Sequence, residues 1–408
     1  MKAFCYKFFK IQSDILYIRV FKDTKMRLLT FFISCLLLGC HANSSFGPLQ
    51  MGAEQLDKYI GLLEDKRVAI VANQSSEVHG VHLVDTLLSR NIHIEKVFAP
   101  EHGFRGEADA GSQIHDTTDE KTGLAIYSLY GSSKKPSKEL LDSVDIIVFD
   151  IQDVGARFYT YISTLHYVME ACAENDIPIL VLDRPNPNGH YIDGPILEPG
   201  LASFVGMHPI PIVHGMTLSE YAQMINGEYW LSDSLQCQLY WQEMQNYNHQ
   251  MPYELPIKPS PNLPNSQSIS LYPSLCLFEG TDLSVGRGTK YQFQVLGSPF
   301  LDSCSFYFTP ISRAGAKYPK YKDKECCGWD LHKSTIGKEI NLSYLIDSYR
   351  QYKYLKRPFF NSFFDKLSGT TELRKQIELG WTENQIKETW SQGLEEFKNV
   401  RQLYLLYP

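Results

Sequence analysis

One loop concentrates the side chains that could carry out chemistry. Residues 98–111 read FAPEHGFRGEADAG, so that an apolar stretch runs directly into a charged segment interrupted by glycines. The ionisable side chains of this loop are Glu101, His102, Arg105, Glu107 and Asp109. So many charges are costly to hold in a partly buried cleft unless they pair with each other or with a ligand. We therefore predict an active site here; the alternative is a solvated loop whose charges face water.

Polar side chains also follow three further apolar stretches. They are Asn73 and Gln74 after residues 67–72, Asp150, Gln152, Asp153 and Arg157 at and after residues 145–150, and Asp183 and Arg184 after residues 179–182. Continuous apolar strands that alternate with helices are typical of a parallel sheet covered on both faces. Ligands of such sheets bind outside the carboxyl ends of the strands. We therefore expect these strand ends to meet at one site.

The elements that must position these residues fall into two predicted domains, 45–235 and 236–408. Strands are expected at 67–72, 94–99, 145–150 and 179–182, with a weaker one at 124–129, and helices at 54–63, 81–90 and 160–174. Thr217 and Glu220 have the spacing of a capping box that opens a further helix. The second domain holds another charged, glycine-rich loop with Glu279 and Arg287. It ends in a helix with an apolar stripe that we expect to pack into the core, namely Ile386, Trp390, Leu394, Phe397 and Tyr404.

Residues 1–39 are predicted to be a targeting segment rather than part of the fold. Lys25 and Arg27 precede the apolar run 28–38, and residues 37–40, Leu-Leu-Gly-Cys, resemble a bacterial lipobox. The run of about 11 residues is shorter than the ~20 that a membrane span needs. Cys40 would then anchor the protein through lipid to a bacterial membrane, facing the periplasm, with the outer membrane favoured. The alternative is an ordinary signal peptide; residues 1–25 are expected to be an upstream extension.

Composition argues against several classes of partner and cofactor. The chain of 408 residues has a net charge of −7, and residues 1–39 hold seven basic and two acidic side chains, so the remainder has 32 basic and 44 acidic side chains and a net charge of −12, which argues against nucleic acid as a partner. No GxGxxG motif is present, and residues 286–290 lack phosphate-loop spacing. The nine cysteines show no CxxC spacing, so we expect mostly buried or free thiols and no zinc, with any disulfide unassigned. No cofactor and no metal are expected.

Six separated motifs are together similar to the family once called domain of unknown function 1343. They are APEHGFRGEADAG, DIQDVGARFYTYISTL, VLDRPNPNG, PIVHGMTLSEYA, SPNLP and FEGTDLSVGRGT. The similarity covers about residues 55–408. It implies a Rossmann-like catalytic domain, a smaller auxiliary α+β domain, and an active site between them. Because known members include exo-acting β-N-acetylmuramidases, it also implies release of N-acetylmuramic acid from the non-reducing end of peptidoglycan fragments such as MurNAc-GlcNAc.

This activity suggests a role for each candidate residue. Glycoside hydrolysis needs a carboxylic acid that protonates the leaving oxygen, and usually a second carboxylate, although a 2-acetamido sugar can supply its own nucleophile. We expect Glu101 to be the acid and His102 to orient it. The candidates for the second carboxylate are Glu107, Asp150, Asp153 and Glu279. The lactyl carboxylate of muramic acid suits an arginine fork.

The expected substrate-binding residues lie in the same motifs. They are Arg105, Asp153, Arg157, Tyr159, Arg184, His214, Asn262 and Arg287. Tyr159 is a candidate for stacking on the sugar face, and His214 is equally well explained as a structural histidine beside a helix cap.

Two other functions stay open from the residues alone. An amidase or deacetylase acting on the same material would need a metal, for which Glu101, His102, Asp150 and His214 are the available ligands, although no HxxxH or HExxH spacing is present. A non-catalytic peptidoglycan-binding lipoprotein would bind the glycan and form no product.

Overall fold

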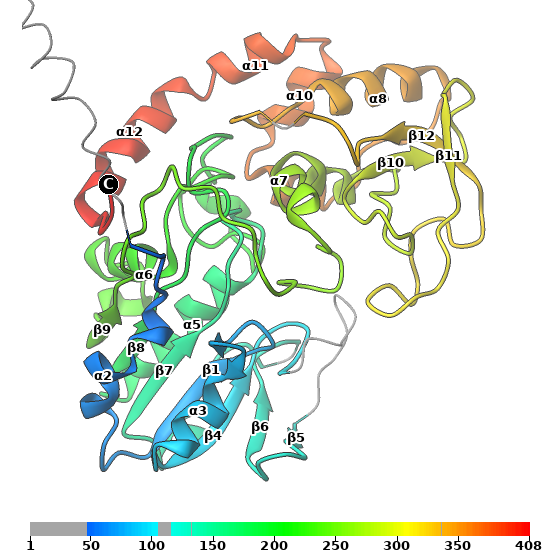
Figure 1. The fold of residues 1–408 in the computed structure, drawn as a ribbon. Coiled ribbons are helices and arrows are strands. Elements are labelled where there is room, and N and C mark those ends of the chain that lie inside the picture. Colours follow the sequence, from blue (N-terminus) through cyan, green and yellow to red (C-terminus); the bar gives the residue numbers. More distant parts are fainter. Residues whose placement is uncertain (1–46, 105–115, 132, 336) are drawn as a thin grey trace, which may run out of the picture. The chain divides into compact units, whose positions relative to one another are not determined.

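Short runs of buried apolar residues form the central strands of a seven-stranded sheet (Figure 1). The computed structural model describes residues 47–104, 116–131, 133–335 and 337–408, and within them the strand order is β5-β6-β4-β1-β7-β8-β9. The strands are β1 Val68–Ala72, β4 Ile94–Ala99, β5 Thr117–Thr118, β6 Ala125–Ser128, β7 Ile146–Asp150, β8 Ile179–Leu182 and β9 Leu239–Gln242. Neighbouring strands are parallel except for β5 and β6. The predicted parallel sheet is confirmed.

Different helices cover the two faces of this sheet, because successive residues of a strand point to opposite sides. Ile70 of β1 packs in one core with helix α3 (Leu83–Ser89), whereas Val71 packs in another core with helix α5 (Tyr161–Glu174). Both residues are fully buried. The sheet is therefore covered on both sides, as the continuous apolar strands predict.

The order of the strands creates a crevice at their carboxyl ends. From β1 the chain proceeds to β4 and β6, and it then returns to the other side of β1 to add β7, β8 and β9. This is the strand order of Rossmann-like folds, whose ligands bind at the point of reversal. All of β9 falls within the predicted second domain, 236–408, but its pairing with β8 makes it the edge strand of the large sheet.

The second part of the chain forms a smaller unit of helices around an antiparallel sheet of order β10-β12-β11 (Figure 1). Its strands are β10 Val295–Ser298, β11 Phe306–Phe308 and β12 Cys326–Asp330, and its helices are α7 Ser266–Leu275, α8 Ser343–Tyr354, α9 Phe364–Ser368, α10 Glu372–Glu378, α11 Glu383–Glu388 and α12 Ser391–Arg401. The predicted smaller α+β part is confirmed. Among the residues described, no helix has the length and apolar character needed to cross a membrane.

The other elements are short, apart from α6. They are helices α2 Leu56–Tyr59, α4 Lys138–Leu141 and α6 Leu218–Gly227, the hairpin strands β2 Glu77–Val78 and β3 Val81–His82, and the 3-10 turns η1 Gly52–Glu54, η2 Ile60–Leu62, η3 Pro199–Leu201, η4 Ser232–Ser234, η5 Cys276–Gly280 and η6 Gln402–Tyr404. Figure 1 shows the carboxyl terminus, which follows η6, beside α6. There the Tyr407 hydroxyl donates a hydrogen bond of 2.7 Å to Asp183 Oδ2, so this polar strand end has a structural partner.

Two local predictions have different outcomes. The capping box of α6 is confirmed, because Thr217 Oγ1 accepts from the Glu220 amide and Glu220 Oε2 accepts from the Thr217 amide at 2.9 Å. The single carboxy-terminal helix is wrong, because α11 ends at Glu388 and α12 begins at Ser391. Thr389 Oγ1 donates to the Ile386 carbonyl at this break, a side-chain bond that competes with helical pairing.

Cys304 and Cys327 form a disulfide that joins the segment before β11 to β12. The sequence alone predicts no particular pairing. The other described cysteines are buried free thiols, as expected for most of them: Cys172, Cys237, Cys276 and Cys326.

Candidate active site

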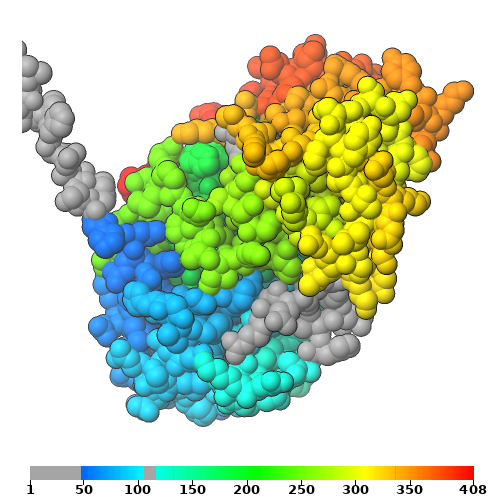
Figure 2. Space-filling model, turned by 45° about the vertical axis from the view of Figure 1, so that its right-hand side comes forward, coloured from blue at the N-terminus to red at the C-terminus, as the bar shows by residue number. Residues whose placement is uncertain are grey.

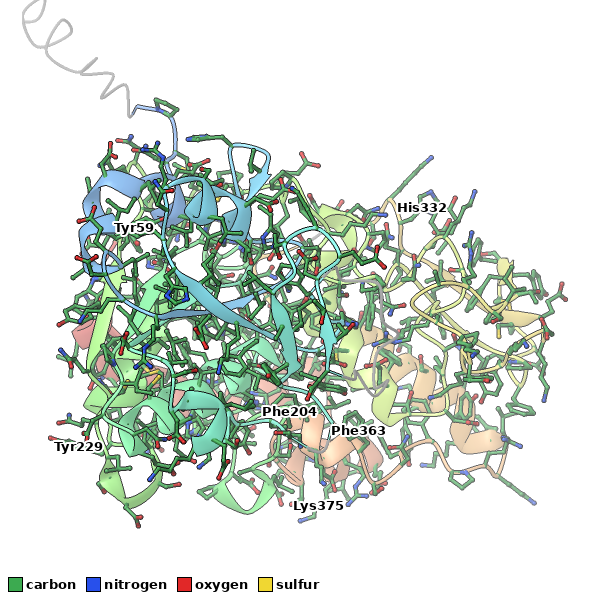
Figure 3. All side chains as sticks on the ribbon, turned by 90° about the horizontal axis from the view of Figure 1, so that it is seen from below. Tyr59, Phe204, Tyr229, His332, Phe363 and Lys375 are labelled. Atoms are coloured by element: carbon green, nitrogen blue, oxygen red, sulfur yellow. A yellow bond between two sulfur atoms is a disulfide. The ribbon has the colours of Figure 1, made fainter. Side chains whose placement is uncertain are left out.

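A cavity of about 790 Å³ collects residues from both parts of the chain. Its walls include Glu101 and His102 after β4, residues 158–161 at the start of α5, and side chains between Ser260 and Lys320. Phe204 and Phe363, both labelled in Figure 3, also line it. Figure 2 shows the yellow residues of the second part on the same face of the molecule as the cyan residues around 120.

The backbone after β4 directs Glu101 into this cavity. The strand ends at Ala99, and the chain then reverses at His102 and Gly103, whose φ angles are 74° and 78°. A positive φ is uncommon for a residue with a side chain, and such residues cluster at functional sites. The reversal is closed by a hydrogen bond of 3.0 Å from the Gly103 amide to the Pro100 carbonyl.

Two hydroxyl groups hold the Glu101 carboxylate. Thr160 Oγ1, at the start of α5, donates to Glu101 Oε2 at 2.8 Å. The Tyr130 hydroxyl, just beyond β6, also forms a hydrogen bond with Glu101, and burial together with the Glu101 charge raises the pKa of Tyr130. The predicted acid thus lies in the cavity with its carboxylate oriented by neighbours from two other elements. Neither neighbour was predicted from the sequence. Tyr130 could have been, because it follows a strand and ligands of parallel sheets bind outside the carboxyl ends of the strands.

A second carboxylate, Glu279, lines the same cavity. Arg287 Nε donates to Glu279 Oε1 at 2.6 Å, and the guanidinium carbon lies 5.0 Å from the centre of the Phe293 ring. Burial works against the charge of Arg287, but the adjacent carboxylate raises its pKa overall. Glu279 and Arg287 therefore form an ion pair in the wall of the cavity and are not two independent groups.

Asp150 and Arg184 do not line this cavity in the part of the chain that the structure describes. Arg184 Nε and Nη2 donate to the two carboxylate oxygens of Asp150 at 2.5 and 2.9 Å, and both side chains are buried. Because β7 and β8 are neighbours, their polar ends meet and neutralise each other. The roles expected for them, second carboxylate and anion partner, find no support in this arrangement.

Arg157 is also directed away from the cavity. Its side chain is fully buried and donates to four backbone carbonyls, those of Pro195, Ile210, Leu367 and Ser368. These contacts tie the loops after β8 to the end of α9. The substrate contact expected for Arg157 is replaced by a structural one.

Asp153 and His214 form a buried pair that likewise does not line the cavity. His214 Nε2 lies 3.9 Å from Asp153 Oδ2, which accepts a hydrogen bond of 2.6 Å from the Gly155 amide. Burial raises the pKa of Asp153 to about 7 and lowers the pKa of His214 to about 3. In the folded protein, burial therefore favours the neutral carboxyl form of Asp153 and the neutral imidazole form of His214.

Tyr159 and Asn262 line the cavity, as expected, but their polar groups have partners in the wall. The Tyr159 hydroxyl donates to the Pro259 carbonyl at 2.9 Å, and Asn262 Nδ2 donates to the Gly315 carbonyl at 2.8 Å. They therefore offer ring faces and an amide edge to a ligand. Arg105 and Glu107 lie outside the described residues.

The cavity also contains residues with no signal in the sequence motifs. Lys317, Tyr318 and Lys320 line it from the loop between β11 and β12.

Within the described ranges, no group of three or more His, Cys, Asp or Glu side chains is arranged to hold a metal ion. Of the ligands that the amidase alternative requires, Asp150 and His214 are placed in the buried pairs already described.

A Rossmann-like sheet with two carboxylates in a cavity at its carboxyl edge places this chain among α/β proteins whose site is suited to glycoside cleavage. The family profiles for the N-terminal and C-terminal parts of exo-β-N-acetylmuramidase NamZ match residues 68–267 and 270–407. The chain belongs to this family.

Individual relatives agree with this assignment. The chain is 39% identical over 374 residues to the peptidoglycan β-N-acetylmuramidase NamZ of Bacillus subtilis (strain 168), covering 86% of this chain and 89% of that protein. A crystal structure of a DUF1343 family protein from Bacteroides fragilis NCTC 9343 superimposes with a TM-score of 0.82 at 48% identity, covering 88% of this chain and 99% of the other. A second DUF1343 structure from the same strain gives a TM-score of 0.75 at 29% identity, with the same coverage.

Proposed function

We propose that this protein is an exo-acting glycoside hydrolase that releases N-acetylmuramic acid from the non-reducing end of peptidoglycan fragments. The observation that carries the proposal is the placement of Glu101, a carboxylate held by two hydroxyl groups, in a cavity shared with Glu279. The relative from Bacillus subtilis, a peptidoglycan β-N-acetylmuramidase, supports the choice of substrate.

Glu101 is the group that protonates the glycosidic oxygen. General acid catalysis requires a carboxyl group fixed against the leaving group, and Thr160 and Tyr130 supply that fixation. Glu279 is the described candidate for the second carboxylate, and it forms an ion pair with Arg287 in the wall of the cavity. If the acetamido group of the substrate acts as nucleophile instead, Glu279 would steer that amide.

The cavity fits a short oligosaccharide. Its volume, about 790 Å³, lies within the ~300–1,000 Å³ that small-ligand sites span. Tyr159, Phe204 and Phe363 contribute aromatic surface to the wall, which suits the apolar faces of sugar rings. The site therefore combines the acid that the reaction needs with surfaces that can hold the sugar.

Product analysis on two isomeric disaccharides tests this function. The purified protein is incubated with MurNAc-GlcNAc and, separately, with GlcNAc-MurNAc, and the products are followed by mass spectrometry. We expect free N-acetylmuramic acid from the first disaccharide and no cleavage of the second. Cleavage of both, or binding of MurNAc-GlcNAc without any product, would contradict the proposal; the second outcome would identify a non-catalytic binding protein.

We also propose that the protein is lipid-anchored at Cys40 and faces the periplasm. The support is the lipobox-like sequence at residues 37–40, which precedes the described part of the chain. Growth with an alkyne fatty acid, followed by click labelling, should mark the wild type in the membrane fraction and should not mark Cys40→Ala. Equal labelling of the two proteins would contradict the anchor.

A further inference from the structure

We propose that Lys320 binds the lactyl carboxylate that distinguishes muramic acid from glucosamine, an inference that rests on the proposed muramidase function. An arginine was the expected partner for this carboxylate. Of the four candidate arginines, Arg105 lies outside the described residues, Arg157 and Arg184 are buried with other partners, and Arg287 is already paired with Glu279.

Lys320 differs from these arginines because, among the residues that the structure describes, no carboxylate forms an ion pair with it. It lines the cavity and keeps solvent-accessible surface there. The two carboxylates that act on it electrostatically are Glu279 and Asp282, and each has an arginine partner. Glu279 pairs with Arg287 at 2.6 Å, and Asp282 pairs with Arg357 at 3.4 Å.

The position of the ammonium group leaves donors for a ligand. Lys320 Nζ donates one hydrogen bond to the Thr281 carbonyl, which fixes it beside the loop that carries Glu279. An ammonium group has three donors, so two can point to a bound anion. The cavity walls remove part of its hydration, and this desolvation lowers the pKa of Lys320.

A carboxylate in the cavity would relieve this cost. A cation that has lost hydration without gaining a counter-ion is unfavourable, and a charge-assisted hydrogen bond with a ligand carboxylate supplies the missing interaction. Among the groups of MurNAc-GlcNAc, the lactyl ether carries the only carboxylate. Lys320 would therefore select muramic acid over glucosamine at the same subsite while Glu101 performs the proton transfer.

The test compares the acid with its ester. Wild type, Lys320→Met and Lys320→Arg are assayed on MurNAc-GlcNAc and on the same disaccharide with its lactyl group as a methyl ester. Wild type should prefer the acid, and Lys320→Met should raise KM for the acid roughly 10- to 100-fold, the range for hydrogen bonds to charged groups, while the ester is little affected. Lys320→Arg should restore much of the preference.

The control is Lys324→Met, which removes an exposed lysine of the same loop that does not line the cavity. Its kinetics should match those of the wild type. A Lys320→Met protein that keeps the preference for the acid would overturn this inference, as would equal losses on acid and ester. A wild type that cleaves neither disaccharide would instead refute the muramidase function itself.

Discussion

Replacing Arg157 by methionine separates a structural role from a role in substrate binding. The guanidinium is fully buried and bridges two regions of the chain. Nη1 donates to the carbonyls of Pro195 and Ile210 at 2.8 and 2.6 Å, and Nη2 donates to those of Leu367 and Ser368 at 3.1 and 2.7 Å. Methionine fills part of the same volume and donates none of these bonds.

The expected loss follows from these four contacts. A buried carbonyl left without a donor costs about 1–3 kcal/mol. Part of that cost is offset because the variant no longer buries a charge, whose desolvation lowers the pKa of Arg157 to about 9. We therefore expect a net loss of about 3–5 kcal/mol, similar to breaking a buried charged network, out of the ~5–15 kcal/mol that stabilise a typical protein.

Urea denaturation measures this loss, and kinetics on the folded fraction show whether substrate binding changes. The matched control is Arg350→Met, which removes an exposed arginine on α8 and should change stability by less than about 0.5 kcal/mol. We expect Arg157→Met to unfold at much lower urea with KM close to the wild-type value. Unchanged stability together with a tenfold higher KM would refute the structural role of Arg157 and would indicate that its side chain binds the substrate.

Three further predictions concern other parts of the molecule. Burial raises the pKa of Asp153 to about 7 from 3.8, so its contribution to stability is fully present below about pH 3.8 and is lost as the pH rises through about 7. Asp153→Asn should therefore flatten the decline in Tm between about pH 4 and pH 7, and a decline as steep as that of the wild type would be contrary evidence. The double variant Cys304→Ala/Cys327→Ala opens a link between residues 23 positions apart and should lower the free energy of unfolding by about 3 kcal/mol, measured by urea denaturation. Thr160→Val removes a hydroxyl donor from Glu101 and should lower kcat roughly tenfold with little change in KM; a change in KM alone would assign Thr160 to binding.

The sequence predicts the sheet well because the relevant signal is local. The run that forms β1 is apolar at every position, and only a strand covered on both faces buries all of it. The same holds for the turn that carries Glu101, where a strand leads directly into His102 and Gly103. These features depend on neighbours in the chain, which the sequence displays.

The rule that ligands bind at the carboxyl ends of parallel strands is less informative about individual side chains. It places Asp150 and Arg184 at the correct edge, but it does not say whether they face a ligand or each other. Asp150 and Arg184 face each other because β7 and β8 are adjacent. This adjacency is a property of the sheet topology, and neither motif reveals it.

Sequence patterns do not predict contacts between residues that are far apart in the chain. The carbonyls that accept from Arg157 come from positions up to 211 residues away, and backbone carbonyls carry no signal in the sequence. Lys320 lies in an irregular loop outside the recognised motifs, and its relation to Glu279 arises only when the second part of the chain folds.

The most direct test of the central claim compares two leaving groups in Glu101→Gln. MurNAc-GlcNAc has a poor leaving group that needs protonation, whereas p-nitrophenyl N-acetylmuramide releases a stable phenolate without help from an acid. If Glu101 is the general acid, kcat/KM for the disaccharide should fall by ~100-fold or more, and the loss for the p-nitrophenyl substrate should be far smaller. Equal losses on both substrates, or full activity on the disaccharide, would contradict the role of Glu101.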